Sequence, residues 1–346
     1  MTYRGGTPKD EKPDGEDLTD EQRLAMEYIG DAQNLITADG RCEQWKSNVM
    51  ENRPFFSKGN PDLPGLTTYL VCAGPSLEKN VGELREISER GIILSVDAAM
   101  GFLMKNGIVP EFCMSIDGSE KIADMVRDCD TSQTTLVCTP TIHPAVVRGW
   151  KGPIFFVTTY GPGPIEEKRQ NHYHLTRIVK AVKELKPGDE MVVDEHYKVE
   201  FKGLDTRINC GGNVSTCAHH FALQYLKSQQ VVFVGQDLSW KYSDHHYAGS
   251  EHRDHGVKQS QNQGGEHIDV NNEKVLTNLS FLGFKRWHEA MGRNFYGSLV
   301  NATEGGILGV KQAGDKMNFV EFLTLKEAVA KYTPKRRLSA CEVVAQ

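Results

Sequence analysis

The stretch Thr67-Thr68-Tyr69-Leu70-Val71-Cys72-Ala73-Gly74-Pro75-Ser76-Leu77 decides the fold of this chain. Its residues 69–73 form a short apolar run, which is typical of a fully buried strand in a parallel sheet. Gly74 allows a tight bend where the strand ends, and Pro75 and Ser76 suit the first positions of a helix. The stretch therefore predicts a strand, a turn and a helix in succession.

The turn at residues 74–77 has two interpretations that its own residues leave open. It can be a plain connection between a strand and a helix. It can also bind a phosphate, because a helix N-terminus offers unpaired N–H groups and positive potential. A short glycine turn alone is weak support for a phosphate site.

Short apolar runs alternate with helical patterns along the central part of the chain. Beyond residues 69–73 we expect strands at residues 92–96, 112–116, 136–138, 154–157 and 231–234, and one beginning at residue 300. Strands that alternate with helices indicate parallel pairing with helices on both faces. The predicted class is α/β, a Rossmann-like doubly wound and mostly parallel sheet with short helical flanks.

The chain is expected to divide into four segments. Residues 1–20 are a polar tail expected to be disordered, and residues 21–64 are a helical segment and a linker. Residues 65–310 form the predicted catalytic domain. Residues 311–346 carry a final helix, expected over residues 319–332, and a basic tail. Within the catalytic domain, residues 241–272 are long, polar and rich in histidine, which is typical of a functional lid or a disordered loop.

Composition excludes several classes of protein. The chain has 346 residues, 39% of them hydrophobic and 25% charged, as in ordinary globular proteins. A net charge of -6 argues against a protein that coats nucleic acid non-specifically. No apolar run is long enough for a membrane span, and the polar start is not a signal peptide. The 8 cysteines include no C-x-x-C pair, so we expect a cytoplasmic protein without a disulfide framework.

Polar residues follow several of the predicted strands. Asp97, Asp117 and Gln236-Asp237 all stand at expected carboxyl ends. Ligands bind beyond these ends in an open parallel sheet. Each aspartate alone can equally be a helix cap. Their agreement favours a nucleotide site, with N–H groups for phosphates and carboxylates for a ribose, a metal or a base.

Histidines gather in the 241–272 segment. Their spacing matches no standard zinc motif, so no residue is assigned to a metal. A histidine there that works as a general acid or base is the better hypothesis, and His246 is the candidate. The chain contains neither a G-x-S-x-G elbow nor a P-loop, so a serine hydrolase or an ordinary kinase is not expected.

A set of motifs in fixed order resembles the motility accessory factor family, which is also described as the domain of archaeal 6-hydroxymethyl-dihydropterin pyrophosphokinase. The resemblance covers residues 65–310 and is carried by these motifs: Cys72-Ala73-Gly74-Pro75-Ser76-Leu77, Ser95-Val96-Asp97, Ile108-Val109-Pro110-Glu111-Phe112, Ser115-Ile116-Asp117, Gly211-Gly212-Asn213-Val214-Ser215, Val234-Gly235-Gln236-Asp237-Leu238 and Asn301-Ala302-Thr303-Glu304-Gly305-Gly306. Longer members of this family look like flagellin glycosyltransferases, and their central domain is similar to bacterial sialyltransferases.

The resemblance implies roles for particular residues. It implies that Asp97, Asp117 and Asp237 lie near the reacting groups, and with His246 these are the predicted catalytic residues. The expected nucleotide-binding residues are Gly74, Pro75, Ser76, Leu77, Gly211, Gly212, Asn213, Ser215, Gln236, Asn301 and Glu304.

Three functions follow from the motifs and the resemblance. The leading hypothesis is a sialyltransferase-like glycosyltransferase that moves a sugar from a nucleotide-activated donor, with CMP as the candidate nucleotide, to an acceptor hydroxyl. The alternative is an ATP-using, Mg²⁺-dependent 6-hydroxymethyl-7,8-dihydropterin pyrophosphokinase. The third is a non-catalytic nucleotide-binding protein. The acceptor, whether glycan, protein, pterin or nucleic acid, and the oligomeric state stay open, and the short flanks leave no room for a separate acceptor-binding domain.

Overall fold

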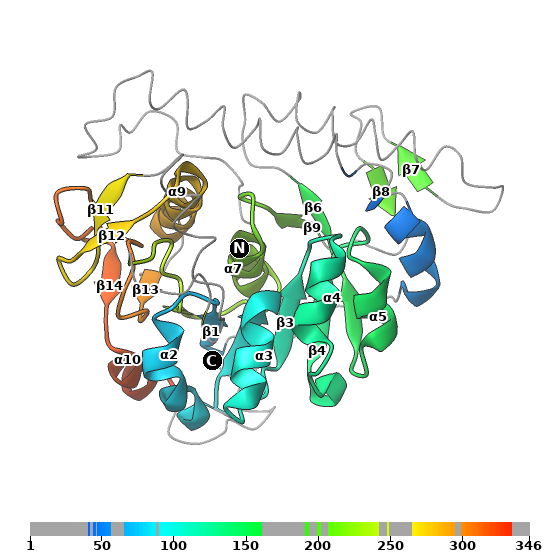
Figure 1. The fold of residues 1–346 in the computed structure, drawn as a ribbon, viewed down its shortest axis with the longest axis horizontal. Helices are drawn as coiled ribbons and strands as arrows, with labels where there is room; N and C mark the ends of the chain where they lie inside the picture. Colours follow the sequence, from blue (N-terminus) through cyan, green and yellow to red (C-terminus); the bar gives the residue numbers. More distant parts are fainter. Residues whose placement is uncertain are drawn as a thin grey trace.

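The fold is built on one central parallel sheet. The computed structural model describes residues 41, 44–45, 47–56, 66–87, 90–160, 191–193, 199–201, 207–241, 248, 265–294 and 299–333. Eight strands run in the order β14-β13-β10-β1-β2-β3-β4-β5, and every neighbouring pair is parallel (Figure 1). They are β1 (Thr68–Val71), β2 (Ile92–Val96), β3 (Phe112–Ser115), β4 (Thr135–Cys138), β5 (Ile154–Phe156), β10 (Val231–Val234), β13 (Leu299–Asn301) and β14 (Val320–Phe322).

The order of the strands reverses once, between β1 and β10. From β1 the chain adds β2, β3, β4 and β5 outward in one direction, and β10, β13 and β14 lie on the other side of β1. Such a reversal is the topological switch point of a doubly wound sheet, and ligands bind there beyond the carboxyl ends of the strands. The predicted α/β class and doubly wound parallel sheet are confirmed.

Helices cover both faces of the sheet. The α-helices are α2 (Leu77–Asn80), α3 (Asp97–Lys105), α4 (Glu120–Val126), α5 (Pro144–Gly149), α7 (Val214–Gln224), α9 (Leu279–Asn294) and α10 (Leu325–Tyr332), and the 3-10 helices are η1 (Arg53–Phe55), η2 (Val81–Glu86) and η3 (Thr131–Gln133). Figure 1 shows α3, α4 and α5 side by side in front of the sheet. One face packs against α7, while Cys113 and Leu136 turn to the opposite core with α4 and α5.

Three small sheets stand beside the central one. β6 (Thr158–Tyr160) pairs in parallel with β9 (Arg207–Asn209), β7 (Met191–Val193) pairs antiparallel with β8 (Val199–Phe201), and β11 (Glu266–Ile268) pairs antiparallel with β12 (Lys274–Leu276). The last pair shows that residues 266–268 of the 241–272 segment form a strand rather than a loop. Most of that segment, like the expected tail at residues 1–20, lies outside the described residues.

The expected helix over residues 319–332 is wrong in its first part. Val320–Phe322 pairs in parallel with β13 as the edge strand β14, and the helix begins only at Leu325. Thr324 caps it, because its hydroxyl accepts from the N–H of Glu327. The pairing partner lies about twenty residues upstream, so local sequence pattern did not reveal the strand.

The expectations about membrane spans and about disulfides can be compared with the described residues. None of the helices in these ranges combines the length and the apolar character needed to cross a bilayer. The six cysteines that the structure describes are free thiols, and four of them are buried: Cys72, Cys113, Cys138 and Cys217.

Candidate functional site

The predicted site residues at the strand ends lie in a row along one edge of the sheet. Asp237, Gly74, Asp97 and Asp117 follow β10, β1, β2 and β3, which are adjacent in that order. Neighbouring strands lie about 4.8 Å apart, so the row spans roughly 15 Å. The structure therefore brings these residues to the switch point, while their chemical roles stay predictions.

Asp237 connects the ends of β10 and β1. Its Oδ2 accepts hydrogen bonds from the hydroxyl of Ser76 at 2.7 Å and from the Ser76 N–H at 3.4 Å. Gly74 lies so close that a Cβ there would stand 1.9 Å from this Oδ2 and 2.5 Å from the carbonyl oxygen of Gly235. Asp237 is buried, and these contacts give it a structural role at the switch point that the sequence did not indicate.

The turn at residues 74–77 uses its own N–H groups internally. The N–H of Gly74 donates to the carbonyl of Gly235 at 2.9 Å, and the N–H of Leu77 donates to the carbonyl of Gly74 at 3.1 Å. Pro75 has no N–H, and the side chain of Leu77 is fully buried in the core. The turn therefore fixes the backbone, and its expected contact with a nucleotide stays a prediction.

The turn at residues 301–306 lies directly against this group. A Cβ on Gly305 would stand 3.2 Å from Cβ of Ser76 and 3.3 Å from Oδ1 of Asp237. Asn301 holds the turn, since its Nδ2 donates to the carbonyl of Leu308 at 2.8 Å and its Oδ1 accepts from the Thr303 N–H at 2.9 Å. The predicted nucleotide-binding side chain of Asn301 is thus engaged within the protein.

Glu304 and Gly306 give this turn the form of an anion-binding backbone. Their φ angles are +58° and +73°. Within the part of the chain that the structure describes, the N–H groups of residues 304, 305 and 306 make no hydrogen bond. Consecutive N–H groups in such turns form concavities that suit a phosphate. The Glu304 carboxylate accepts from Asn80 at 3.1 Å and from the Leu325 N–H at 2.9 Å, so it supports the turn.

Asp97 is a buried carboxyl group at the end of β2. The hydroxyl of Ser115, on β3, donates to its Oδ2 at 2.7 Å, and the N–H of Ala98 donates to its Oδ1 at 2.8 Å. The pKa of Asp97 is raised to about 6, mainly by burial and to a lesser extent by the nearby charge of Asp117, while the hydrogen bonds from Ser115 and Ala98 oppose the rise. A carboxyl group with a pKa near neutral pH suits a general base.

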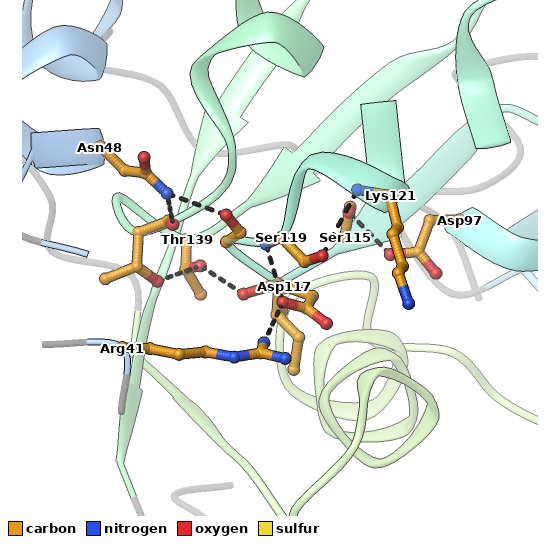
Figure 2. Close-up of polar contacts among 11 residues, drawn as sticks. Arg41, Asn48, Asp97, Ser115, Asp117, Ser119, Lys121 and Thr139 are labelled. Carbon is orange, nitrogen blue, oxygen red and sulfur yellow. Dashed lines mark hydrogen bonds and ion pairs between the residues drawn. The ribbon is translucent and has the colours of Figure 1, made fainter. Parts of the chain in front are cut away.

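Asp117 is held by the N-terminal helical segment. The guanidinium Nη1 of Arg41 lies 2.6 Å from Asp117 Oδ1, which also accepts from the Ser119 N–H at 2.9 Å (Figure 2). Both side chains are partly exposed, 38% for Arg41 and 40% for Asp117. Asp117 is therefore more exposed than the buried carboxyl groups of Asp97 and Asp237.

The turn at residues 211–215 reaches the same edge but is packed under α9. A Cβ on Gly211 would stand 2.4 Å from Cγ of Trp287, and one on Gly212, where φ is +107°, 2.9 Å from Cε1 of Phe284. Asn213 caps α7, since its Oδ1 accepts from the Thr216 N–H at 3.0 Å. These residues serve packing and capping in the structure, and a contact with nucleotide stays a prediction.

Ser215 and Gln236 belong to a buried polar network. Ser215 Oγ lies 3.3 Å from Gln236 Nε2 and 3.1 Å from Nε2 of His288 on α9, and His288 Nδ1 lies 3.1 Å from His219 Nδ1. Burial lowers the pKa of His288 to about 3 and that of His219 well below its usual value, and it lowers the pKa of neighbouring His220 to about 4. The histidines are therefore neutral in the folded protein at pH 7.

These histidines predict acid sensitivity of the fold. Folding favours the neutral form of a histidine whose pKa is lower in the folded than in the unfolded chain. Such a histidine therefore adds to the free energy of unfolding above about pH 6.5, and this stability is lost as the pH falls. We expect a loss of about 2–3 kcal/mol by pH 4.5 for each of His220 and His288, partly offset by Asp97, whose raised pKa acts oppositely. Urea denaturation at pH 7 and pH 4.5 should show a lower free energy of unfolding in acid, and a smaller fall in His288→Gln. Equal values for the wild type at both pH values would refute the burial of neutral histidines.

Several predicted residues cannot be compared. His246 lies outside the described residues, as do most other histidines of its segment. His267 is described and buried, with its Nδ1 2.7 Å from the carbonyl oxygen of Ile268. Ala248 is also described, and its N–H donates to the Ala73 carbonyl at 2.8 Å, so this point of the segment contacts the end of β1. In the described ranges, no three His, Cys, Asp or Glu side chains are grouped to hold a metal ion.

Sequence reasoning missed Arg41, Ser115 and His288. Ser115 stands in one of the motifs that carry the resemblance, but nothing local linked it to Asp97. His288 had no local signal, because its partners are distant in the sequence. For Arg41 a signal existed, since Arg41, Trp45, Asn48 and Asn52 recur at the helical spacing of three and four residues. The stripe is mostly polar, so it did not stand out as a packing face.

Comparisons with known proteins agree with this architecture. A family model described as 6-hydroxymethylpterin diphosphokinase MptE-like matches residues 44–243, more than half of the chain. An uncharacterized protein of Treponema pallidum (strain Nichols) is 31% identical over 108 residues, which are 29% of this chain and 51% of that protein. The solved structure of MAf glycosyltransferase from Magnetospirillum magneticum AMB-1 matches 88% of this chain and 41% of its own, with a TM-score of 0.53 and 15% identity. The chain thus spans about half of the first protein and less than half of the second, and the structural likeness concerns the fold.

Proposed function

The chain belongs to the 6-hydroxymethylpterin diphosphokinase MptE-like family, and we propose that it is a transferase that moves a sugar from a nucleotide-activated donor to an acceptor hydroxyl. The fold shared with a glycosyltransferase over most of the chain supports this choice. The observation that carries the proposal is Asp97, a buried carboxyl group with a pKa of about 6 at the end of β2, next to the switch point.

Asp97 acts as the general base in this proposal. The acceptor oxygen forms a bond with the anomeric carbon of the donor while its proton passes to the Asp97 carboxylate. The bond between that carbon and the donor phosphate oxygen breaks, and its electron pair stays on the nucleotide phosphate. Ser115 orients the base, since its hydroxyl holds the second oxygen of the carboxylate. General base catalysis of this kind contributes roughly 10²- to 10⁴-fold.

The turn at residues 304–306 supplies the group that stabilises the leaving phosphate. Its N–H groups are unpaired among the described residues, and the turn packs against Ser76 and Asp237 at the switch point. N–H groups that are fixed before the reaction stabilise developing negative charge without reorganisation. This charge stabilisation needs no metal ion, so we expect transfer to proceed without one.

Diphosphate transfer from ATP to a hydroxymethylpterin is the second candidate, and the description of the family favours it. Asp97 and Asp117 end adjacent strands, and the charge of Asp117 raises the pKa of Asp97. Two carboxylates this close are ligands of the kind that Mg²⁺ takes beside substrate phosphates. In this reaction Mg²⁺ would supply the neutralisation of the triphosphate.

A panel of donors with and without EDTA tests the proposal. The full chain is incubated with CMP-sugars, with UDP-sugars, or with ATP, Mg²⁺ and 6-hydroxymethyl-7,8-dihydropterin, and products are identified by mass spectrometry. We expect nucleotide release from a nucleotide sugar that survives EDTA. Strict Mg²⁺ dependence with ATP and pterin would favour diphosphate transfer. Nucleotide binding without turnover of any donor would favour the non-catalytic alternative.

A further inference from the structure

The N-terminal helical segment is fixed across the carboxyl ends of β3 and β4. It contains helical residues 47–52 and is the blue helix at the right of Figure 1. Asn48 and Asn52 are buried and one helical turn apart. Asn48 Nδ2 donates to the carbonyls of Gly118 at 3.1 Å and Thr141 at 2.9 Å. Asn52 Nδ2 donates to the carbonyls of residues 140 and 142 at 3.2 and 2.8 Å.

The loop after β3 is shaped to receive this segment. A Cβ on Gly118 would stand 2.8 Å from Cδ1 of Trp45 and 2.9 Å from Nδ2 of Asn48, so only glycine allows the segment to lie this close. Arg41, one turn before Trp45, is thereby placed over Asp117 (Figure 2). The segment expected as a helix and linker is therefore part of the wall of the candidate site.

The guanidinium of Arg41 keeps most of its hydrogen-bonding capacity. It donates through Nη1 to Asp117, and its other N–H groups have no partner among the described residues. The side chain is 38% exposed, so these groups face solvent in part. A guanidinium carries five N–H donors in a planar fork that matches the oxygens of a phosphate.

The carboxyl groups at the strand ends would repel an anion, so a cationic side chain is needed beside them if a phosphate is to bind. Asp97, Asp117 and Asp237 line the edge of four adjacent strands, and a nucleotide phosphate brought there meets three carboxyl groups. Arg41 offsets Asp117 and presents its remaining donors at the same place. Figure 2 shows Lys121 on the other side of Asp117 in that view, and its ammonium has no partner among the described residues.

We propose that Arg41 is a specificity-determining residue whose guanidinium contacts the phosphoryl oxygens of the nucleotide donor. This inference rests on the proposed function for the identity of the donor. It assigns to the segment before the matched family region a direct part in recognising phosphate. A purely structural Arg41–Asp117 pair is the competing account, and partly exposed ion pairs of that kind contribute little to stability.

The test measures the affinity for a phosphoryl anion in matched variants. Isothermal titration of the full chain uses inorganic pyrophosphate, then CMP and cytidine. We expect Arg41→Gln to weaken pyrophosphate and CMP binding roughly 10- to 100-fold, since hydrogen bonds to charged groups contribute about 1.5–3 kcal/mol. Cytidine affinity should stay unchanged, so the advantage of CMP over cytidine shrinks. Arg41→Lys should fall between the two.

Arg148→Gln is the matched control. Arg148, near the end of α5, forms an ion pair with Glu51 of the same N-terminal segment and does not contact the strand-end carboxylates. Arg148→Gln removes the same charge and a similar ion pair to the N-terminal segment, but away from the strand-end carboxylates. Anion binding should therefore stay within about twofold of wild type, while thermal stability changes as in Arg41→Gln.

The outcomes separate this inference from the proposed function. Equal pyrophosphate affinity in wild type and Arg41→Gln, or equal weakening in Arg148→Gln, overturns the role of Arg41 and leaves sugar transfer untouched. Pyrophosphate binding that Arg41→Gln weakens, in a chain that turns over no donor, supports Arg41 and counts against the transferase. If wild type binds neither pyrophosphate nor CMP, the role of Arg41 fails, and sugar transfer from a CMP-linked donor fails with it.

Discussion

Asp97→Asn is expected to lower turnover of the nucleotide sugar by roughly 10²- to 10⁴-fold while the protein stays folded. The amide has nearly the same shape as the carboxyl group: its Oδ1 can still accept from the Ala98 N–H, and its Nδ2 can donate to the Ser115 hydroxyl oxygen. It cannot take a proton from an acceptor. Initial rates at saturating donor, for wild type and variant, measure the effect. An unchanged rate would remove Asp97 from the mechanism.

The same variant should be more stable than wild type at pH 7. The pKa of Asp97 is raised to about 6 in the folded protein, so at pH 7 the ionised carboxylate lowers the free energy of unfolding. This destabilisation disappears as the pH falls toward about 4, where the unfolded chain also becomes protonated. A shift of about two units corresponds to up to about 3 kcal/mol, which the neutral amide avoids. A rise in stability together with a loss of activity is a result that damage to the fold does not produce.

The pH profile of the wild type gives an independent check on Asp97. Below about pH 6 the base becomes protonated, so the rate should fall about tenfold for each pH unit. Ser115→Ala removes a hydrogen bond that lowers this pKa, so the acid limb of its profile should move to higher pH. An acid limb that stays in place would show that another group is titrating.

Gly74→Ala is expected to destabilise the protein by more than about 3 kcal/mol, at the upper end of what overpacking costs. The added Cβ would stand 1.9 Å from Asp237 Oδ2 and 2.5 Å from the backbone carbonyl of Gly235, so the ends of β1 and β10 would have to separate. The contacts between Ser76 and Asp237 would be lost with them. Thermal or urea denaturation measures the change.

Gly82→Ala is the matched control for Gly74→Ala. It introduces the same methyl group at the second residue of η2, where no atom beyond its chain neighbours and its own helix backbone lies within 4 Å of the new Cβ. Its stability should stay within about 0.5 kcal/mol of wild type or rise, because alanine lowers the entropy of the unfolded chain. Equal destabilisation by both substitutions would contradict the close approach of Gly74 to Asp237.

The centre of the fold could be predicted because its signals are local. The apolar run before Gly74 and the similar runs at β2, β3 and β10 are short and bounded by turn residues, which distinguishes buried parallel strands. Strands of this kind place their carboxyl ends at one edge, so the row of Asp97, Asp117 and Asp237 followed from the topology.

The details that sequence could not supply all depend on distant partners. Gly211 has the composition of a phosphate turn, but the structure places Trp287, more than seventy residues away, against it. β14 forms only because β13 offers it an edge. Arg41 lies 76 residues from Asp117, in a segment whose polar stripe looks like a solvent-exposed face. Contacts across such separations leave no periodic signal in the chain.

Release of CMP from a CMP-sugar by the full chain, in EDTA at pH 7.5, tests the central claim most directly when wild type and Asp97→Asn are compared in parallel. Sugar transfer with Asp97 as the base predicts release that is proportional to the wild-type protein concentration and is lost roughly 10²-fold or more in the variant. Release at the same rate in both proteins, or no release from any nucleotide sugar while ATP and pterin react, would contradict it.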